Sequence, residues 1–313
     1  MMVRLTENKI ILIVRKTRLD ELIARFNTEV QARFYIEHLG SDFSDYRRED
    51  RKYKAAVEEA AKVLSRFGRL QVLDRSYVPN FIFGEADTVV VLGQDGLVAN
   101  VLKYLDGQLV VGVNPDPDRW EGVLLPFVLS DLPRAIPAVF RGDRAIRQVT
   151  MARAQLNTGL SLYAVNDLFI GPRSHTSALY SLEIGDHLED QSSSGIIVST
   201  GLGSTGWYRS ILAGATGIAA FVSGSEVAAD RVTNFQWDSD FLYFSVREPW
   251  PSKTSSAAIT FGKITLEQPL HLVSRMPENG VIFSDGIEKD FIEFNSGTRA
   301  TITIADKKGH LVV

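Results

Sequence analysis

The 313-residue sequence contains no cysteine. This absence excludes disulfide bonds, thiolate metal sites and cysteine nucleophiles. The five histidines show no metal-ligand spacing, so we expect no zinc site. Long apolar runs are also missing. The run Ile10–Val14 is far too short to span a bilayer and lacks a signal-peptide pattern, so we expect a cytoplasmic protein with no membrane partner.

The charge balance is slightly acidic, with a net charge of -4. Such a balance argues against nucleic acid as the main partner, and we expect none. The hydrophobic share of 45% and the charged share of 23% are ordinary for a globular protein. The length is too great for one small core and suits two domains.

The first half of the sequence alternates between strand and helix patterns. Its β-α-β order with short crossovers predicts a parallel sheet. Helical spacing also favours Gly68 as the C-cap of the second helix. The predicted strands are Ile10–Val14, Leu70–Leu73, Thr88–Leu92 and Leu109–Val113, and the predicted helical stretches are Leu19–Phe34, Tyr53–Phe67 and Leu97–Leu105.

The second half has few long helical periods and many short β-rich segments separated by turn residues. We therefore expect a mostly antiparallel second domain. Prolines 133 and 137 interrupt any regular pattern, which places the boundary between Pro133 and Arg147 and gives an α/β domain over 1–140 and a β-rich domain over 141–313. The β-rich segments are Phe241–Val246, Ile259–Leu266, Val281–Phe283 and Ala300–Ile304.

A glycine-containing turn, Gly93-Gln94-Asp95-Gly96, follows the predicted strand Thr88–Leu92 and precedes a predicted helix. Open α/β sheets bind ligands at the carboxyl ends of their strands. Glycines allow backbone N–H groups to approach a phosphate, and a helix N-terminus adds a favourable dipole. Asp95 is then placed to accept a proton or to hold a hydrated magnesium ion. The same residues also suit an ordinary tight turn.

A second glycine cluster occupies Gly201–Gly206 and matches G-x-G-x-x-G, the dinucleotide fingerprint of hydride-transfer enzymes. Glu226 lies twenty residues beyond it, after a possible helix at 207–212 and a strand-like stretch at 218–222. The hairpin-like strands that follow argue against a doubly wound sheet. The serine and threonine of the cluster suggest hydroxyl donors to phosphate or ribose, and a plain loop is a third interpretation.

A third candidate is the adjacent pair Asn166 and Asp167, which precedes another predicted strand. An amide and a carboxylate together can read an adenine edge or a ribose diol through paired donors and acceptors. The alternative is an Asx turn that opens the strand. The prolines of Val113–Gly122 stiffen that segment, and its spacing is not that of a calcium loop, so we predict a rigid loop beside the Asp95 turn.

The three clusters occur in the order found in NAD kinases, and the sequence resembles that family. The family's GGDG turn, Asn-Glu pair and GSTAY-like segment read here as Gly93–Gly96, Asn166-Asp167 and Gly203–Trp207. The likeness is greatest to the mitochondrial type of eukaryotic NAD kinase and its bacterial relatives. It includes a VGVN-x-DP-x-R-x-EG stretch, an FS-x-REP stretch and a late DG, here Val111–Gly122, Phe244–Pro249 and Asp285-Gly286. It extends from about Lys9 to the end.

The resemblance implies an α/β N-terminal domain with a parallel sheet and a mostly antiparallel, β-sandwich-like C-terminal domain, with NAD bound between them. Asp95 matches the catalytic aspartate, and Asn166 and Asp167 match the adenosine-binding pair. The expected phosphate- or ATP-binding residues are Gly93, Gln94, Gly96, Gly203 and Ser204, and the other expected NAD contacts are Thr205, Gly206, Trp207 and Ser210. The sequence departs from the family pattern at Gln94, Leu97, Asp167, Ser194 and Trp207.

The function implied is ATP-dependent phosphorylation of the adenosine ribose 2′-hydroxyl of NAD to give NADP. Asp95 would act as general base, and magnesium would be carried by the nucleotide rather than by a protein metal site. A homodimer or homotetramer is expected. Three alternatives stay open: a nucleotide-binding protein of the same fold with weak or no kinase activity, a related lipid or sugar kinase, and an NAD(P)-binding oxidoreductase. The sequence does not decide between NAD and NADH or identify the phosphate donor.

Overall fold

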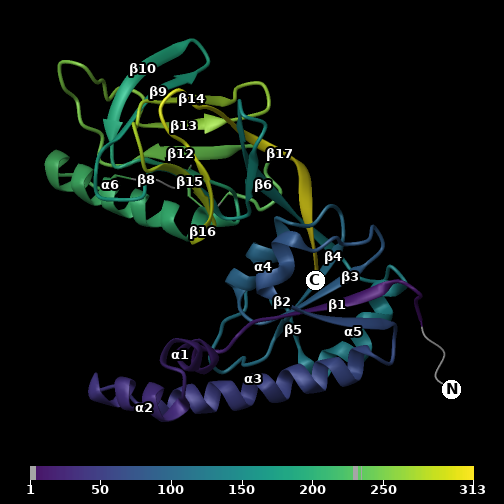
Figure 1. Cartoon of the computed structure of the whole chain (residues 1–313). Coiled ribbons are helices and arrows are strands. Elements are labelled where there is room, and N and C mark those ends of the chain that lie inside the picture. The colour runs from purple at the N-terminus through teal and green to yellow at the C-terminus, as the bar shows by residue number, and fades with distance from the viewer. Residues whose placement is uncertain (1–4, 228–231, 234) are drawn as a thin grey trace. The chain divides into compact units, whose positions relative to one another are not determined.

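The structure is a computed structural model that describes residues 5–227, 232–233 and 235–313. The chain forms two compact units (Figure 1). Unit 1 comprises Met1–Arg147 and His310–Val313, and unit 2 comprises Gln148–Gly309. Among the helices of the described residues, none combines the length and the apolar character needed to cross a membrane.

Unit 1 is built around a parallel sheet in the order β2-β1-β3-β4, and β5 and the last residues of β17 also pair with β4 in parallel. The predicted parallel sheet is therefore confirmed. The strands are β1 (Lys9–Val14), β2 (Arg69–Asp74), β3 (Thr88–Leu92), β4 (Leu109–Asn114) and β5 (Phe127–Val128). The helices are α1 (Arg18–Phe26), α2 (Glu29–His38), α3 (Phe43–Leu64), α4 (Asp95–Leu102) and α5 (Leu132–Phe140), with 3-10 turns η1 (Arg75–Asn80) and η2 (Leu129–Asp131).

Helices cover both faces of this sheet (Figure 1). Alternate strand residues such as Leu12, Val90 and Val111 form one buried cluster with the apolar sides of α3 and α5. The helix α4 packs against β3 and β4 and, in Figure 1, lies on the other side of the sheet from α3. Because both faces are covered, β3 is buried along its whole length, as its unbroken apolar run predicts.

Two helical predictions for unit 1 were wrong in detail. The predicted stretch Leu19–Phe34 is two helices, because Asn27 has a left-handed backbone (φ 67°) and Thr28 caps the start of α2. Beyond Asn27, the apolar residues at helical spacing are not all buried, since Phe34 is 71% exposed. The C-cap of α3 is Ser65 rather than Gly68.

The prolines at 133 and 137 do not mark an irregular segment, as the sequence suggested, because both lie within α5. Pro133 occupies the first turn, where a missing N–H group costs nothing. Pro137 lies inside the helix, a position that ordinarily costs about 3 kcal/mol. The apolar face of α5, which includes the fully buried Leu132, Ala135 and Ile136, offsets that cost by burial against the sheet.

Unit 2 has two sheets that share one core. Among the described residues, nine strand pairings within it are antiparallel, as predicted. One sheet has the path β10-β9-β14-β17, with β6 and β7 beside β17, and the other has the order β13-β12-β11-β8-β15-β16. Tyr180 and Leu182 of the first sheet and Ile170 and Phe244 of the second lie in one buried cluster, which gives the unit a sandwich core.

The segments predicted in unit 2 fall on strands or helices of the structure, with one exception in type. The strand-like stretch at 218–222 belongs to a helix, α6, because a run of small and apolar residues continues the helix that begins at Trp207. The elements are β6 (Ile146–Leu156), β7 (Ser161–Ala164), β8 (Asp167–Pro172), β9 (Ala178–Ile184), β10 (His187–Ser193), β11 (Ile196–Ser199), η3 (Gly203–Thr205), α6 (Trp207–Ser223), β12 (Leu242–Val246), β13 (Phe261–Ile264), β14 (Leu270–Ser274), β15 (Gly280–Ser284), β16 (Ile287–Glu293) and β17 (Arg299–Val312).

The hydroxyl of Tyr53, on α3, joins the carboxyl ends of two strands of unit 1. It donates a hydrogen bond to the carbonyl oxygen of Leu92 at 2.8 Å and accepts one from the N–H of Arg15 at 2.9 Å. The side chain is buried, and this burial raises the pKa of Tyr53 to about 12. The hydroxyl therefore stays neutral and satisfies two main-chain groups immediately beside the Asp95 turn.

We predict that Tyr53→Phe lowers the free energy of unfolding by about 1–3 kcal/mol, because the Leu92 carbonyl and the Arg15 N–H lose their partner while the ring is kept. Urea denaturation measures the change. Tyr77→Phe, at a ring that is 65% exposed, is the matched control and should change the stability by less than about 0.5 kcal/mol. Equal stability of Tyr53→Phe and the parent would show that the Tyr53 hydroxyl does not stabilise the fold.

Candidate functional site

The turn Gly93–Gly96 joins the buried end of β3 to the start of α4. The backbone of Gln94 is extended (φ -118°, ψ 163°), so a residue other than glycine occupies this position without strain. Its carbonyl oxygen accepts the N–H groups of Leu97 and Val98 at 2.9 and 3.3 Å. The N–H groups of Asp95 and Gly96 begin the helix and have no acceptor within it. This end of α4 is therefore a positive, donor-rich surface that suits an anion.

The Asp95 carboxylate is held in place by the loop that follows β4. Its Oδ1 accepts a hydrogen bond from the N–H of Leu124 at 2.7 Å, and the side chain is half-buried. The loop packs onto β4 so closely that a Cβ at Gly112 would lie 2.0 Å from the Leu124 carbonyl oxygen. Asn114 braces the same loop, because its amide donates to the Trp120 carbonyl oxygen at 2.9 Å. The predicted placement of this loop beside the Asp95 turn is confirmed.

Asn166 and Asp167 lie at the start of β8 in unit 2, and their side chains have unused hydrogen-bonding capacity. Asn166 is half-buried and Asp167 is 9% exposed. Among the described residues, neither the amide nor the carboxylate has a side-chain hydrogen bond. Burial, and secondly the nearby charge of Asp285, raise the pKa of Asp167 to about 7. A buried carboxylate beside a half-buried amide, both without a side-chain hydrogen bond, is a candidate for ligand recognition.

The second glycine cluster lies directly against this pair. A Cβ at Gly203 would be 2.0 Å from the Asn166 carbonyl oxygen, so only glycine permits the approach. Thr200 ties the two segments together, because its hydroxyl donates to the Val165 carbonyl oxygen at 2.5 Å and accepts from the Gly203 N–H at 3.1 Å. The structure therefore brings two of the predicted clusters into one place.

The remaining predicted residues of the cluster differ in what they can offer a ligand. Ser204 is buried, and its hydroxyl donates to the Gly201 carbonyl oxygen at 2.7 Å, so its hydrogen is used inside the protein. Thr205, Gly206 and Ser210 are exposed around the start of α6. Trp207 is 39% exposed and stacks on Phe169, with ring centroids 5.8 Å apart and an interplanar angle of 12°. The Arg247 guanidinium lies 5.1 Å from the Trp207 ring centroid.

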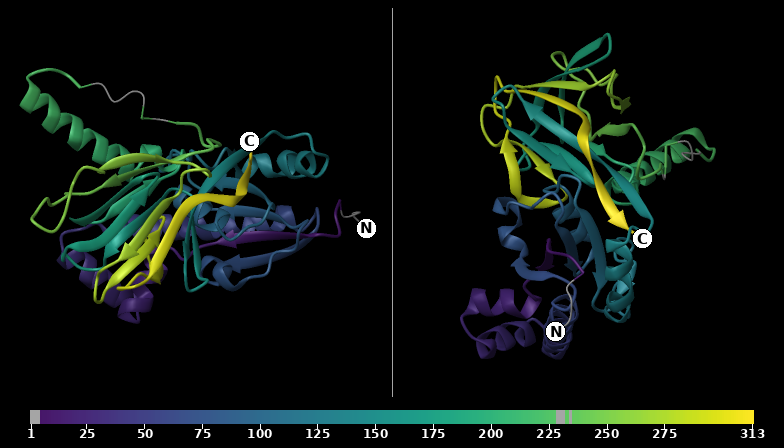
Figure 2. Two further views of the ribbon diagram at one scale, coloured as in Figure 1. Left: turned by 90° about the horizontal axis from the view of Figure 1, so that it is seen from above. Right: turned by 90° about the vertical axis from the view of Figure 1, so that its right-hand side faces the viewer.

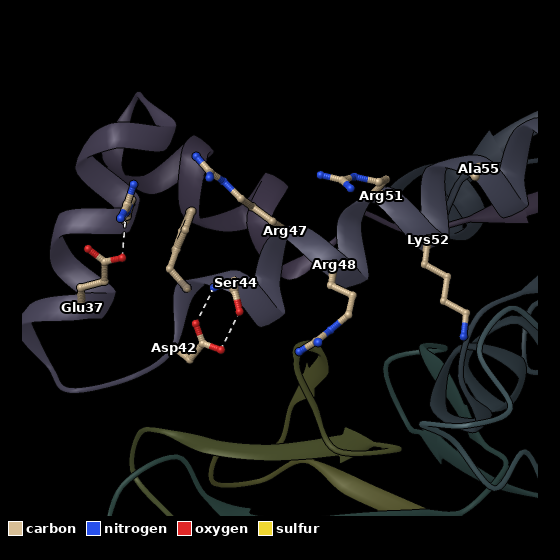
Figure 3. A pocket seen from close by; sticks show the side chains of 10 residues that line it. Glu37, Asp42, Ser44, Arg47, Arg48, Arg51, Lys52 and Ala55 are labelled. Atoms are coloured by element: carbon tan, nitrogen blue, oxygen red, sulfur yellow. Dashed lines mark hydrogen bonds and ion pairs between the residues drawn. The ribbon is translucent and has the colours of Figure 1, made fainter.

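Unit 1 also has a basic groove of about 790 Å³ between α2 and α3 (Figure 3). Arg47 and Arg51 leave one side of α3 in this view, and Arg48 and Lys52 leave the other. Most of the cations are neutralised by exposed ion pairs. These pairs are Arg33–Glu37, Arg47–Glu29, Arg48–Asp45 and Lys52–Asp116. The groove is therefore a solvated charged surface, and we assign no ligand to it.

Curated proteins named NAD kinase are similar to part of this chain, although no model of a known protein family matches it. NAD kinase 2 of Geobacillus kaustophilus is 27% identical over 133 residues, which are 41% of this chain and 49% of that protein. The NAD kinase of Geobacter metallireducens is 32% identical over 133 residues, which are 40% and 46% of the two chains. The chain thus spans about half the length of the curated relatives it matches.

Two solved structures match nearly the whole chain. An NAD kinase from Archaeoglobus fulgidus in complex with ATP has a TM-score of 0.56 and 15% identity, over 97% of this chain and 93% of that one. Yeast NADH kinase complexed with NADH has a TM-score of 0.57 and 14% identity, over 98% and 84%. The chain has the fold of the NAD kinases. The family resemblance and the fold class that the motifs predicted are confirmed.

Three groups that shape these clusters were not predicted from the sequence as site residues. They are the Leu124 N–H, the Thr200 hydroxyl and the Asp285 carboxylate. The first is a main-chain group, which leaves no signal in a side-chain pattern. Thr200 stands next to the glycine cluster and was visible only as a strand-end residue. Asp285 was noted as part of the late Asp-Gly motif, but the sequence assigned it no role in a site.

The raised pKa of Asp167 predicts how the stability depends on pH. Between about pH 4 and pH 7 the unfolded chain has lost this proton while the folded chain retains it, so the stability falls as the pH rises. Asp167→Asn stays neutral and should lack this loss. Because the pKa rises from 3.8 to about 7 and each pH unit is worth about 1.4 kcal/mol, the advantage of the variant at pH 8 is at most about 4 kcal/mol.

Urea denaturation between pH 5 and pH 8 measures this difference. The control is Asp186→Asn, which removes an exposed carboxylate in the turn between β9 and β10 and should leave the fall in stability caused by Asp167 in place. A constant difference between Asp167→Asn and the parent at every pH would mean that Asp167 titrates as an ordinary surface carboxylate.

Proposed function

We propose that this chain is an NAD kinase that transfers the γ-phosphate of ATP to the 2′-hydroxyl of the adenosine ribose of NAD. The observation that carries the proposal is the position of Asp95. It stands at the carboxyl end of a buried parallel strand, at the start of a helix, and one carboxylate oxygen is fixed by the Leu124 N–H. The other oxygen is then available to a substrate hydroxyl.

In the proposed reaction, Asp95 accepts the proton of the ribose 2′-hydroxyl as that oxygen attacks the γ-phosphorus. The new P–O bond forms while the bond to the leaving ADP breaks. Positioning supplies most of the rate, since phosphoryl transfer asks little covalent chemistry of the protein. The N–H groups at the start of α4, with Gly93, Gln94 and Gly96, are proposed to bind phosphate oxygens.

The adenosine part of NAD is proposed to bind to unit 2. Asn166 and Asp167 offer an amide and a carboxylate without internal partners, and such groups gain most from a ligand that satisfies them. Gly203, Ser204, Thr205, Gly206, Trp207 and Ser210 are proposed to line the same site. In this proposal the segment 1–140 supplies the phosphate-binding turn and the segment 141–313 supplies the NAD contacts.

Magnesium is proposed to arrive with the ATP phosphates. Among the described residues, no group of three or more histidine, aspartate or glutamate side chains is arranged to hold a metal ion. Bound to the ATP phosphates, magnesium neutralises charge that develops on the phosphate oxygens.

The oxidoreductase alternative does not fit the fold. A dinucleotide fingerprint needs a parallel β-α-β unit. The strand before the glycine cluster, β11, is antiparallel to both of its neighbours, and residues 218–222 are helical. A nucleotide-binding protein with weak activity, or a related lipid or sugar kinase, is distinguished from an NAD kinase by assay. We further propose a cytoplasmic location.

We predict that Asp95→Asn lowers the rate of NADP formation by about 10² to 10⁴-fold, because an amide keeps the size of the carboxylate but cannot accept the proton. Coupled detection of NADP measures the rate, and circular dichroism checks the fold. Asp118→Asn, at a side chain that is 94% exposed in the loop after β4, is the control and should keep the parent rate. Parent-like turnover by Asp95→Asn would mean that Asp95 is only a turn residue and not the general base.

A homodimer or homotetramer is proposed, with α6 in its interface. This helix extends away from the strands of its own unit (Figure 2, left). Ile218, Phe221 and Val222 are 70%, 90% and 79% exposed. Arg209, near its start, is its only charged residue. The part of the helix that carries Ile218, Phe221 and Val222 therefore has no charge that would oppose a second copy.

We predict that Phe221→Glu shifts the parent oligomer towards monomer, since a buried unpaired carboxylate is costly in an interface. Sedimentation velocity gives the masses. Leu188→Glu, at another exposed apolar residue of unit 2, is the control and should leave the assembly unchanged. A parent that sediments as a monomer contradicts the proposed assembly, and an intact Phe221→Glu oligomer places the interface elsewhere.

A further inference from the structure

Asp285 lies in the turn that joins β15 to β16, and its backbone is left-handed. Its φ is 54°, and that of Gly286 is 68°. Two consecutive residues with positive φ are typical of the tight hairpin turn that Asp-Gly favours. A hairpin turn alone explains the backbone of Asp285, and Asn or Gly would serve the turn equally well.

The side chain of Asp285 makes contacts that the hairpin does not need. Its Oδ1 accepts hydrogen bonds from the N–H of Asn166 at 2.6 Å and of Val165 at 2.9 Å, and Oδ2 lies 3.2 Å from the same Val165 N–H. Its own N–H donates to the Asp167 carbonyl oxygen at 3.0 Å. Asp285 therefore fixes the main chain on both sides of Asn166.

The negative charge of the Asp285 carboxylate is unfavourable for the neighbouring Asp167. This charge is one reason why the pKa of Asp167 is raised, so it works against the ionised form of that side chain. An amide at this position would accept the same N–H groups without that charge. Hydrogen bonds from N–H groups to a carboxylate are the stronger kind, which makes the acid the firmer anchor for the backbone.

We propose that Asp285 is a positioning residue for NAD: it holds the backbone of residues 165–167 so that the Asn166 amide and the Asp167 carboxylate face the adenosine. This inference rests on the proposed function. Asp285 touches neither substrate, and it acts through the two residues that do. It should therefore affect the binding of NAD and leave the transfer of the phosphate unchanged once NAD is bound.

The test compares Asp285→Gly with Asp285→Asn by calorimetric titration with NAD. Glycine suits the positive φ and removes the side chain, so the NAD dissociation constant should rise about tenfold or more. Asparagine tolerates this backbone and its amide oxygen accepts the same N–H groups, so affinity should stay within about threefold of the parent. The KM for NAD should rise in Asp285→Gly while kcat at saturating NAD changes by less than about threefold.

The control is Asn279→Gly, at another non-glycine residue with positive φ, 60° in the turn before β15. It should leave NAD affinity unchanged. Thermal melting checks that each variant folds, and if Asp285→Gly does not, Asp285→Ser, whose hydroxyl replaces one acceptor, should show an intermediate loss. Parent-like NAD affinity in Asp285→Gly, or an equal loss in Asn279→Gly, overturns the positioning role while the proposed function stands. A parent that does not bind NAD contradicts both.

Discussion

Carboxylates that accept hydrogen bonds from main-chain N–H groups fix both candidate clusters. In unit 1 the Leu124 N–H orients Asp95, and in unit 2 the N–H groups of Val165 and Asn166 meet Asp285. Bonds of this kind are short and strong, and they place a side chain relative to a backbone that is itself packed. Because each donor belongs to a loop, the loops rather than the strands decide where the polar groups point. The buried sheets supply the rigid frame from which those loops start.

The sequence predicted those strands and helices whose apolar pattern is visible within a few consecutive residues. The run Thr88–Leu92 is a buried parallel strand with the predicted bounds. The prediction succeeded because a strand that is covered on both faces appears in the sequence as a nearly unbroken apolar run. The pattern was misleading for two helices. A helix continues through Pro137 because its apolar face is buried, and residues 218–222 are helical although their β-branched and aromatic side chains suit a strand.

The candidate site was predictable as a list of residues and not as an arrangement. The sequence identified Asn166 and the glycine cluster separately, and only the fold brings Gly203 against the Asn166 carbonyl oxygen. Gln94 illustrates the reverse case. In the family pattern it replaces a glycine, yet its extended backbone carries no strain, so the substitution is compatible with the proposed phosphate-binding turn. A backbone angle cannot be read from residue identity alone, because most residues adopt several.

The central claim is that this chain phosphorylates the adenosine ribose of NAD. The most direct measurement incubates the parent protein with NAD, ATP and magnesium and follows the phosphorus NMR spectrum of the products. We expect a new phosphomonoester on the ribose 2′-oxygen, with one ADP formed for each NADP. ATP consumed without NADP, or NAD left unchanged by the folded protein, would contradict it.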